Sequence, residues 1–417
     1  MPLPPPPRRP GLTPWRMVVG LGFVSLFIDM VADGAASVSG ALLEQLGATA
    51  LLVGLVSGGA QALALVLRLV TGPWADRTGA YWAFTIVGYA LTAVCVPLLA
   101  ITPMLGAAGL AVASALILVE RTGKAVRSPA KTVLLADAAH AVGLGKGFGV
   151  HKTLDQIGAF AGPLIVAGVA ALTGSLAPAF LVLIIPAAIA MVLLFWLRAK
   201  VPDPSLYRPV DDEPKPQSKA TASVIPSEAE TRERFRTFLL FSLFAGLTTF
   251  GLLSYGIISF HLAAAELVPV GIVPVIYAVG MAAAAVAAFV TGWAYDRWGP
   301  RTLYAVPVMT VFVPGLVLGP TLAFVIVGVV VWGAATGVQD STVKALVADL
   351  VPGRRRGSAY GWFAVFQGVG ALLGAVVAGA LYANVPLLMG LVAALQVAAI
   401  VVLAIVLRRR RSARIAE

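Results

Sequence analysis

The residues best placed to carry chemistry are two aspartates in an otherwise apolar stretch. Asp29 and Asp33 lie four residues apart, so both carboxylates point to one face of a helix. Two neighbouring carboxylates at low dielectric cannot both ionise easily, and one is expected to hold a proton near neutral pH. Binding and releasing that proton is the task of a proton-coupling site. The structural alternative is an ion pair with Arg68 in the next apolar stretch.

Basic and amide side chains within apolar stretches are candidates for a substrate cavity. Arg68 and Arg121 could bind an anionic substrate, and Arg68 could instead extend toward the membrane surface. Gln61 lies seven residues before Arg68, on nearly the same helix face. Aromatic residues in such stretches usually pack against lipid or other helices. The remaining cavity candidates are Tyr255, Tyr277, Trp332, Gln339 and Gln367.

A charged cluster follows the fourth apolar stretch. Glu120 and Lys124 are four residues apart and are expected to pair on the surface. A solvated helix end would account for Lys124 and Arg127. An internal contact of this cluster with Asp76 is a further possibility. We assign Glu120 and Lys124 to gating or structural pairing.

Two further pairs have helical spacing near the ends of apolar stretches. Lys152 and Asp155 are three residues apart, and Asp340 and Lys344 are four apart. Each pair can satisfy its own charges on one helix face. Their position near helix ends favours gating or structural pairing over direct contact with a substrate.

These residues belong to a chain whose composition excludes an ordinary soluble protein. Of its 417 residues, 59% are hydrophobic and 12% are charged, against about 25% charged in soluble domains. The net charge of +11 could suggest nucleic acid, but the charges lie at the ends of apolar runs. We therefore expect a lipid bilayer and no nucleic acid as partner. The single cysteine excludes an internal disulfide, and the three scattered histidines suggest no metal site or cofactor.

The apolar residues fall into twelve runs, each about long enough to span a membrane as a helix. Basic residues occur only in the tails, in every second loop, and within spans or at their ends. This alternation predicts a multi-pass protein of the cytoplasmic membrane with both termini in the cytoplasm. The predicted spans are 16–36, 50–71, 83–101, 104–122, 154–174, 176–197, 237–260, 268–292, 302–318, 321–340, 359–382 and 386–407.

A polar, proline-rich segment divides the spans into two sets of six. Residues 199–236 carry both signs of charge and are expected to form a flexible cytoplasmic linker. It separates an N-terminal six-helix bundle (16–198) from a C-terminal one (237–407). The predicted tails are 1–15 and a basic segment, 408–417.

The two halves repeat each other. Residues 71–79 match 291–299 at a shift of 220, each following the second span of its half. Gly158 and Gly162 match Gly370 and Gly374 at a shift of 212. Two matched landmarks in the same order indicate an internal duplication, which is common in transporters.

The first repeat resembles the loop signature of the major facilitator superfamily, G-x-x-x-D-[RK]-x-G-[RK]-[RK]. In that family these loops latch the two halves in the outward-facing state. The basic pair that ends the signature is replaced by Ala80 and Tyr81, which implies an altered latch. The matching residues are Gly72, Asp76, Arg77 and Gly79 in the first copy, and Gly292, Asp296, Arg297, Gly299 and Arg301 in the second.

Two other segments extend the resemblance. Gly158, Gly162 and Pro163 are similar to the fifth-helix signature of family antiporters, although G-x-x-x-G is also common in membrane helix packing. Residues 120–129 and 147–155 are similar to a prokaryotic subgroup with R-x-G-K-x-x-R-x-x-P-R and F-G-x-H-[RK]-x-x-D. The subgroup implies no particular substrate.

The resemblance implies an all-α membrane protein with twelve helices in two pseudo-symmetric six-helix bundles. The leading hypothesis is a monomeric secondary transporter that exports a small molecule in exchange for protons, with Asp29 or Asp33 changing protonation. One alternative is uptake or exchange of an anionic metabolite through Arg68 and Arg121. A membrane receptor without transport would not need charge inside the bundle. A membrane-embedded enzyme is disfavoured because G-x-S-x-G and H-E-x-x-H are absent from the sequence.

Overall fold

The computed structural model describes residues 11–207, 228–340 and 356–416, and all regular elements in these ranges are helices. The N-terminal bundle consists of α1 (Pro14–Ala36), α2 (Ser39–Gln45), α3 (Ala50–Val66), α4 (Arg68–Thr78), α5 (Tyr81–Leu98), the 3-10 segment η1 (Leu99–Ala108), α6 (Gly109–His140), α7 (Leu144–Thr173), α8 (Leu176–Val182) and α9 (Ile184–Lys200).

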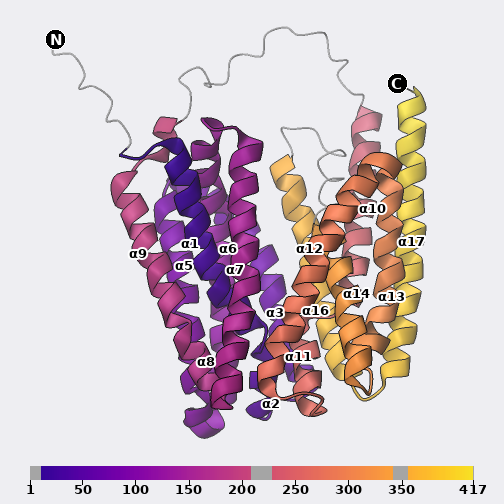
Figure 1. Cartoon of the computed structure of the whole chain (residues 1–417). Coiled ribbons are helices and arrows are strands. Elements are labelled where there is room, and N and C mark those ends of the chain that lie inside the picture. Colours follow the sequence, from indigo (N-terminus) through magenta and orange to yellow (C-terminus); the bar gives the residue numbers. More distant parts are fainter. Residues whose placement is uncertain (1–10, 208–227, 341–355, 417) are drawn as a thin grey trace, which may run out of the picture.

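The C-terminal bundle repeats this arrangement. It consists of α10 (Glu228–Gly251), α11 (Tyr255–Ala264), α12 (Val273–Trp298), α13 (Ala305–Val317), α14 (Leu322–Val338), α16 (Arg356–Ala380) and α17 (Val385–Ala416). The start of α1, the end of α9, the start of α10 and the end of α17 all lie at one end of the molecule (Figure 1). We call this the terminal end and the opposite one the distal end.

The twelve predicted spans are confirmed. Within the described residues, ten helical stretches are long and apolar enough to cross a membrane, and one of them, Tyr81–His140, contains two predicted spans. The tenth predicted span corresponds to a shorter apolar helix, Leu322–Val338. Helices α6 and α7 extend beyond the fourth and fifth predicted spans, because α6 continues to His140 and α7 begins at Leu144. Hydropathy reports burial in lipid and so does not mark these polar, glycine-containing extensions.

The seventh span is broken. α10 ends at Gly251 and α11 begins at Tyr255, with Leu253 between them at φ 48°. The indole Nε1 of Trp332 donates a hydrogen bond to the Leu253 carbonyl oxygen at 3.1 Å. A side chain of α14 thus satisfies a carbonyl that the break removes from the helical ladder. Breaks of this kind within a span are tolerated where the backbone faces protein or a cavity.

Glycine contacts place the internal repeat in three dimensions. A Cβ at Gly158 or Gly162 of α7 would collide with the carbonyls of Leu26 and Met30 of α1. In the other bundle, a Cβ at Gly370 or Gly374 of α16 would collide with the carbonyls of Gly246 and Phe250 of α10. Small residues allow such close helix approach. The contacts coincide when the sequence is shifted by 212 and 220 residues, which confirms the pseudo-symmetry.

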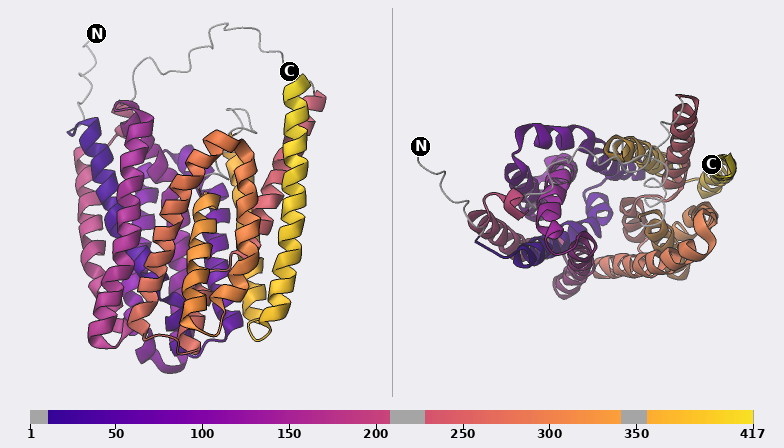
Figure 2. Two further views of the ribbon diagram at one scale, coloured as in Figure 1. Left: turned by 45° about the vertical axis from the view of Figure 1, so that its right-hand side comes forward. Right: turned by 90° about the horizontal axis from the view of Figure 1, so that it is seen from above.

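The hydrophobic core shows how the bundles meet. One buried cluster near the distal end includes Val31, Leu42, Ile257 and Trp332, and so joins both bundles. Toward the terminal end there are two separate clusters, one in each bundle. The bundles contact each other through α3 and α16, α7 and α12, and α2 and α11. Figure 2 shows them side by side from the terminal end.

Candidate functional site

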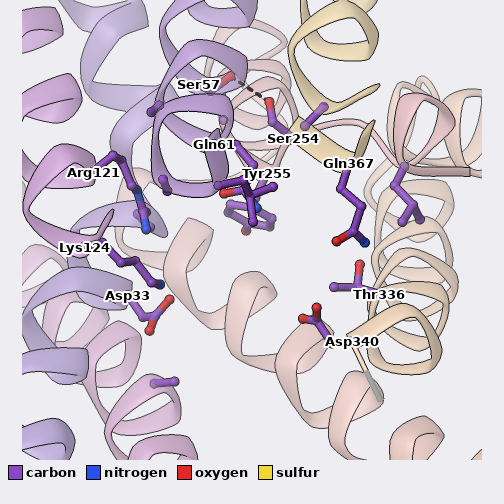
Figure 3. Close-up of a pocket in the computed structure, with 18 of the residues that line it drawn as sticks. Asp33, Ser57, Gln61, Arg121, Lys124, Ser254, Tyr255, Thr336, Asp340 and Gln367 are labelled. Atoms are coloured by element: carbon purple, nitrogen blue, oxygen red, sulfur yellow. Dashed lines mark hydrogen bonds between the residues drawn. The ribbon is translucent and has the colours of Figure 1, made fainter. Parts of the chain in front are cut away.

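A cavity of about 580 Å³ lies between the bundles and is lined by both of them. It extends from Ser57 and Ser254 toward Lys131, Lys152 and Asp340. Figure 3 shows part of its lining, with Arg121, Lys124 and Asp33 on one side and Gln367, Thr336 and Asp340 on the other. The residues predicted from sequence that line it are Asp29, Asp33, Gln61, Arg68, Arg121, Lys124, Lys152, Asp155, Tyr255, Tyr277, Trp332, Gln339, Asp340 and Gln367.

The distal end of the cavity is closed by contacts between the bundles. The hydroxyl oxygens of Ser57 and Ser254 lie 2.7 Å apart and share a hydrogen bond. The Gly40 backbone N–H donates to the Ser259 hydroxyl at 3.1 Å. A Cβ at Gly40 would collide with the Gly256 carbonyl, so α2 and α11 touch backbone to backbone at this point.

Asp33 joins the two bundles. The Tyr277 hydroxyl of α12 donates a hydrogen bond to the Asp33 carboxylate of α1 at 2.9 Å. In the described part of the chain, the other side-chain hydrogen bonds between the bundles involve only serine hydroxyls. The Asp33–Tyr277 bond therefore places an ionisable carboxyl in the contact between the halves.

Asp29 has different partners from those expected. Its carboxylate lies 3.6 Å from the Arg127 guanidinium, so the ion pair of Asp29 is with Arg127 and not with Arg68, the alternative partner considered from the sequence. The Asp29 carboxyl also faces the Asp155 carboxyl of α7. Asp29 therefore has two acidic neighbours, Asp33 on its own helix and Asp155 on α7.

Asp155 lies in a basic surrounding. The predicted pair with Lys152 is confirmed, with 2.7 Å between the Lys152 ammonium and the Asp155 carboxylate. The Lys131 ammonium lies 3.9 Å away from the same carboxylate and donates a hydrogen bond to the Ser25 hydroxyl at 3.1 Å. Ser25 in turn shares a hydrogen bond with His151 Nε2 at 3.0 Å. Neither Lys131 nor Ser25 had a role predicted from the sequence.

The cluster on α6 is buried within the bundle. Glu120 is 5% exposed, forms an ion pair with Arg121 at 3.2 Å and accepts a hydrogen bond from Thr92. The expected surface pairing with Lys124 is therefore wrong. Arg127 is 3% exposed and donates to the Thr92 hydroxyl at 2.8 Å. The expected solvated helix end is absent here because α6 continues past Arg127 to His140.

Arg68 and Lys124 of the cavity make no hydrogen bond and no ion pair within the described residues. Each still faces a carboxylate at longer range, Asp340 for Arg68 and Asp33 for Lys124. Arg68 Nε is buried without an acceptor. Arg121, Arg127, Lys131 and Lys152, the other basic groups of the lining, all have carboxylate partners.

The C-terminal wall of the cavity, formed by the C-terminal bundle, presents aromatic rings and glutamine amides. The rings of Tyr255 and Tyr277 pack edge to face with centroids 4.6 Å apart, and Trp332 lies 5.6 Å from Tyr255. The Tyr255 hydroxyl donates to the Val273 carbonyl within its own bundle. Gln339 donates to the Thr249 hydroxyl, while its buried Oε1 has no partner.

The loop signatures lie outside the cavity. Gly79 ends α4 with φ 63°, a conformation that favours glycine. Asp76 accepts a hydrogen bond from the Tyr81 hydroxyl at 3.1 Å, and so contacts the residue that replaces the usual base. In the second copy, the Arg297 guanidinium lies 5.9 Å from the centroid of the Trp293 ring.

The described residues include only part of the predicted set. Lys344 lies outside the described residues, as does the side chain of Asp296. Gly72 lies near Pro129, because a Cβ added at Gly72 would lie 3.7 Å from the Cβ of Pro129. At Gly292 a Cβ would meet nothing within 4 Å.

Comparison with known proteins identifies relatives. The family model of the Major Facilitator Superfamily matches residues 21–318 and 252–417. Uncharacterised proteins of Mycobacterium tuberculosis and Mycobacterium bovis are 43% identical over 400 residues, covering 95% of this chain and 94% of the relative. An MFS-type transporter of Methanocaldococcus jannaschii is 29% identical over 143 residues, 34% of each chain.

Solved transporter structures share the fold. A variant of the nucleoside transporter NupG superposes with a TM-score of 0.72 at 14% identity, covering 93% of this chain and 99% of that chain. A variant of the peptide transporter POT gives 0.71 at 15% identity, covering 95% of each. A bacterial homologue of the lysosomal transporter Spinster, in an inward-facing conformation, gives 0.65 at 17% identity, covering 95% and 96%.

Proposed function

Because this chain belongs to the Major Facilitator Superfamily, we propose that it is a secondary active transporter that exports a small molecule in exchange for protons. The transport class follows from the family, whose fold places a substrate cavity between two bundles. The coupling and the direction are our inference. The observation that carries the coupling is the hydrogen bond from Tyr277 to Asp33 across the bundles.

The cycle is alternating access. The distribution of basic residues favours a cytoplasmic terminal end, so the present arrangement is inward-facing, with the distal end closed. Substrate enters from the cytoplasm, and the bundles then rock so that the distal contacts part and the terminal ends approach.

Asp33 couples this motion to protons. An ionised carboxylate accepts a stronger hydrogen bond from Tyr277 than a protonated carboxyl does, so protonation weakens the distal contact. The charged and titratable groups facing Asp33 are Asp29 on its own helix, Arg121 and Lys124 on α6, and Tyr277 on α12. A substrate bound at the two cations would change the electrostatic surroundings of the Asp33 carboxyl.

The export direction is supported by the similarity of Gly158, Gly162 and Pro163 to family antiporters. A second candidate is uptake or exchange of an anionic metabolite. It is favoured by the lining of the cavity, which holds six basic and four acidic side chains. Arg121 is a weaker anion ligand than the sequence suggested, because Glu120 already pairs with it.

The coupling can be tested without knowing the substrate. Spin labels at Gln45→Cys and Ala265→Cys, in a Cys95→Ala background, report the distance across the distal end. We expect wild type to shift toward longer distances as the pH falls, because protonated Asp33 releases Tyr277. Asp33→Asn and Tyr277→Phe should give the long distances at every pH.

A matched control is Tyr382→Phe, which removes a partly buried hydroxyl that is hydrogen-bonded to His261 inside the C-terminal bundle, at 2.8 Å. It should shift with pH as wild type does. A Tyr277→Phe variant that retains the full pH response would remove this bond from the mechanism.

The direction requires a flux measurement. Protein in liposomes with an entrapped pH dye is offered pools of metabolites and drugs under an imposed proton gradient. Antiport predicts that substrate and protons cross in opposite directions, whereas symport predicts the same direction. Proton flux that no pool changes, in folded protein, would argue against proton coupling.

A further inference from the structure

The two walls of the cavity differ in chemistry. All six basic groups of the lining lie on the N-terminal bundle, on α4, α6 and α7. The C-terminal wall offers the rings of Tyr255 and Trp332, the amides of Gln339 and Gln367, and one carboxylate, Asp340. A ligand that touches both walls therefore needs a charged end and an apolar end.

The charged groups that line the cavity indicate the charge of the ligand. The lining holds six basic and four acidic groups, and Glu120 behind it pairs with Arg121. Among the described residues, the two cations of the lining without an ion pair or hydrogen bond are Arg68 and Lys124. Buried cations are costly unless they are paired, so this region of the cavity favours an anion.

The other end of the ligand follows from the opposite wall. Tyr255 and Trp332 present aromatic surface, against which a ring or alkyl body can pack. Gln339 is 4% exposed, and its Oε1 has no hydrogen-bond partner among the described residues. An unpaired buried acceptor is satisfied by a hydroxyl or amine donor. The cavity volume of about 580 Å³ lies within the range of small-molecule sites.

We infer that the substrate is an amphipathic organic anion with an acid group at Lys124 and Arg68, an apolar or ring body against Tyr255 and Trp332, and a donor group to Gln339. This inference rests on the proposed transport function but not on its proton coupling. It differs from a clamp of Arg68 and Arg121, because Glu120 neutralises Arg121.

The test measures binding rather than transport. Purified full-length protein in nanodiscs is titrated with 4-hydroxyphenyl phosphate and 4-hydroxybenzoate, which carry all three features. Two probes of similar size lack the negative charge: neutral 4-hydroxybenzamide and cationic tyramine. Succinate supplies the charge without the ring. Binding is followed by thermal stabilisation and by quenching of tryptophan fluorescence.

We expect both aromatic anions to bind at least tenfold more tightly than the amide, tyramine or succinate. Lys124→Gln and Arg68→Gln should each weaken anion binding about tenfold or more, with little effect on the amide. The matched control is Lys146→Gln, which removes an exposed lysine of α7 outside the cavity. Arg121→Gln should weaken anion binding less than Lys124→Gln does.

Other results would overturn the inference. Equal binding of amide and anion, preferred binding of tyramine, or no binding of either aromatic anion by folded protein would each do so. Should Lys124→Gln fail to fold, Arg68→Gln and the probe series decide alone. Selective anion binding without any pH effect on the distal distance would keep the substrate class and reject the proposed coupling.

Discussion

Arg127 of α6 links buried polar groups of two other helices of the N-terminal bundle, α1 and α5. Its guanidinium contacts the Asp29 carboxylate, donates to Thr92 and lies 4.9 Å from the centroid of the Tyr89 ring. The Thr92 hydroxyl in turn donates a hydrogen bond to the Glu120 carboxylate. The planar guanidinium suits this role, because it offers donors in several directions while stacking on a ring.

Arg127→Met should therefore destabilise the protein strongly while nearly preserving side-chain volume. Loss of one member of a buried ion pair costs about 3–5 kcal/mol, because the remaining charge stays uncompensated. Thermal unfolding of purified protein checks this, with Lys146→Gln as the control. An Arg127→Met variant that unfolded at the wild-type temperature would show that these contacts of Arg127 do not stabilise the fold.

Local spacing decided which residue contacts could be predicted. Lys152 and Asp155 pair as expected because three residues along one helix bring side chains together. The partners of Asp29 lie on α6 and α7, about 100 residues away, and no sequence period indicates them. Tyr277 was expected only as a cavity aromatic, and nothing in the sequence indicated its bond to Asp33.

The helices α1 and α7 owe their close contact to two glycines. Gly158 and Gly162 leave room for the α1 backbone, and Gly370 and Gly374 do the same between α10 and α16. The G-x-x-x-G-P signature therefore has a packing function here, whatever it contributes to transport. In both bundles this contact holds together the first and fifth spans of the repeat.

Gly162→Ala should separate α1 from α7, because the added methyl group would collide with the Met30 carbonyl. We expect a loss of about 1–3 kcal/mol, as for other overpacked sites. Gly374→Ala should lose a similar amount by pseudo-symmetry. Gly168→Ala is the matched control on α7, since a Cβ there meets nothing within 4 Å. Equal unfolding temperatures for Gly162→Ala and Gly168→Ala would contradict this interpretation.

At the scale of elements, the sequence predicted existence and order better than length. The spans follow from apolar runs, and their duplication follows from matched motifs. The extension of α6 to His140 and the break before Tyr255 did not follow. The first lies outside the apolar runs that mark a span, and the second is accompanied by a tertiary hydrogen bond from Trp332 to the Leu253 carbonyl.

The whole molecule is closed at one end because a single core joins the bundles there. Toward the terminal end each bundle keeps its own core. This division allows the bundles to hinge as two rigid bodies, since a packed core resists deformation while an interface between cores can open. Which end is closed could not be predicted from sequence, because both conformations of such a transporter share one set of helices.

Cysteines at the distal contact should trap this state. In a Cys95→Ala background, Ser57→Cys and Ser254→Cys would place two thiols where the hydroxyl oxygens are 2.7 Å apart, close enough for a disulfide. Oxidation should abolish transport in the liposome assay, and a reductant should restore it. Each single cysteine serves as a control, and transport by the oxidised double variant would show that the distal end need not open.

The uneven placement of charge between the two walls has an electrical consequence. A membrane potential of 100 mV acts on each elementary charge with about 2.3 kcal/mol. The empty cavity carries two more basic than acidic groups, so its reorientation moves charge through the field. An anion bound at Lys124 and Arg68 would cancel part of that charge. The loaded and the empty protein would then respond differently to voltage, and the cell's resting potential would select which half of the cycle is slow.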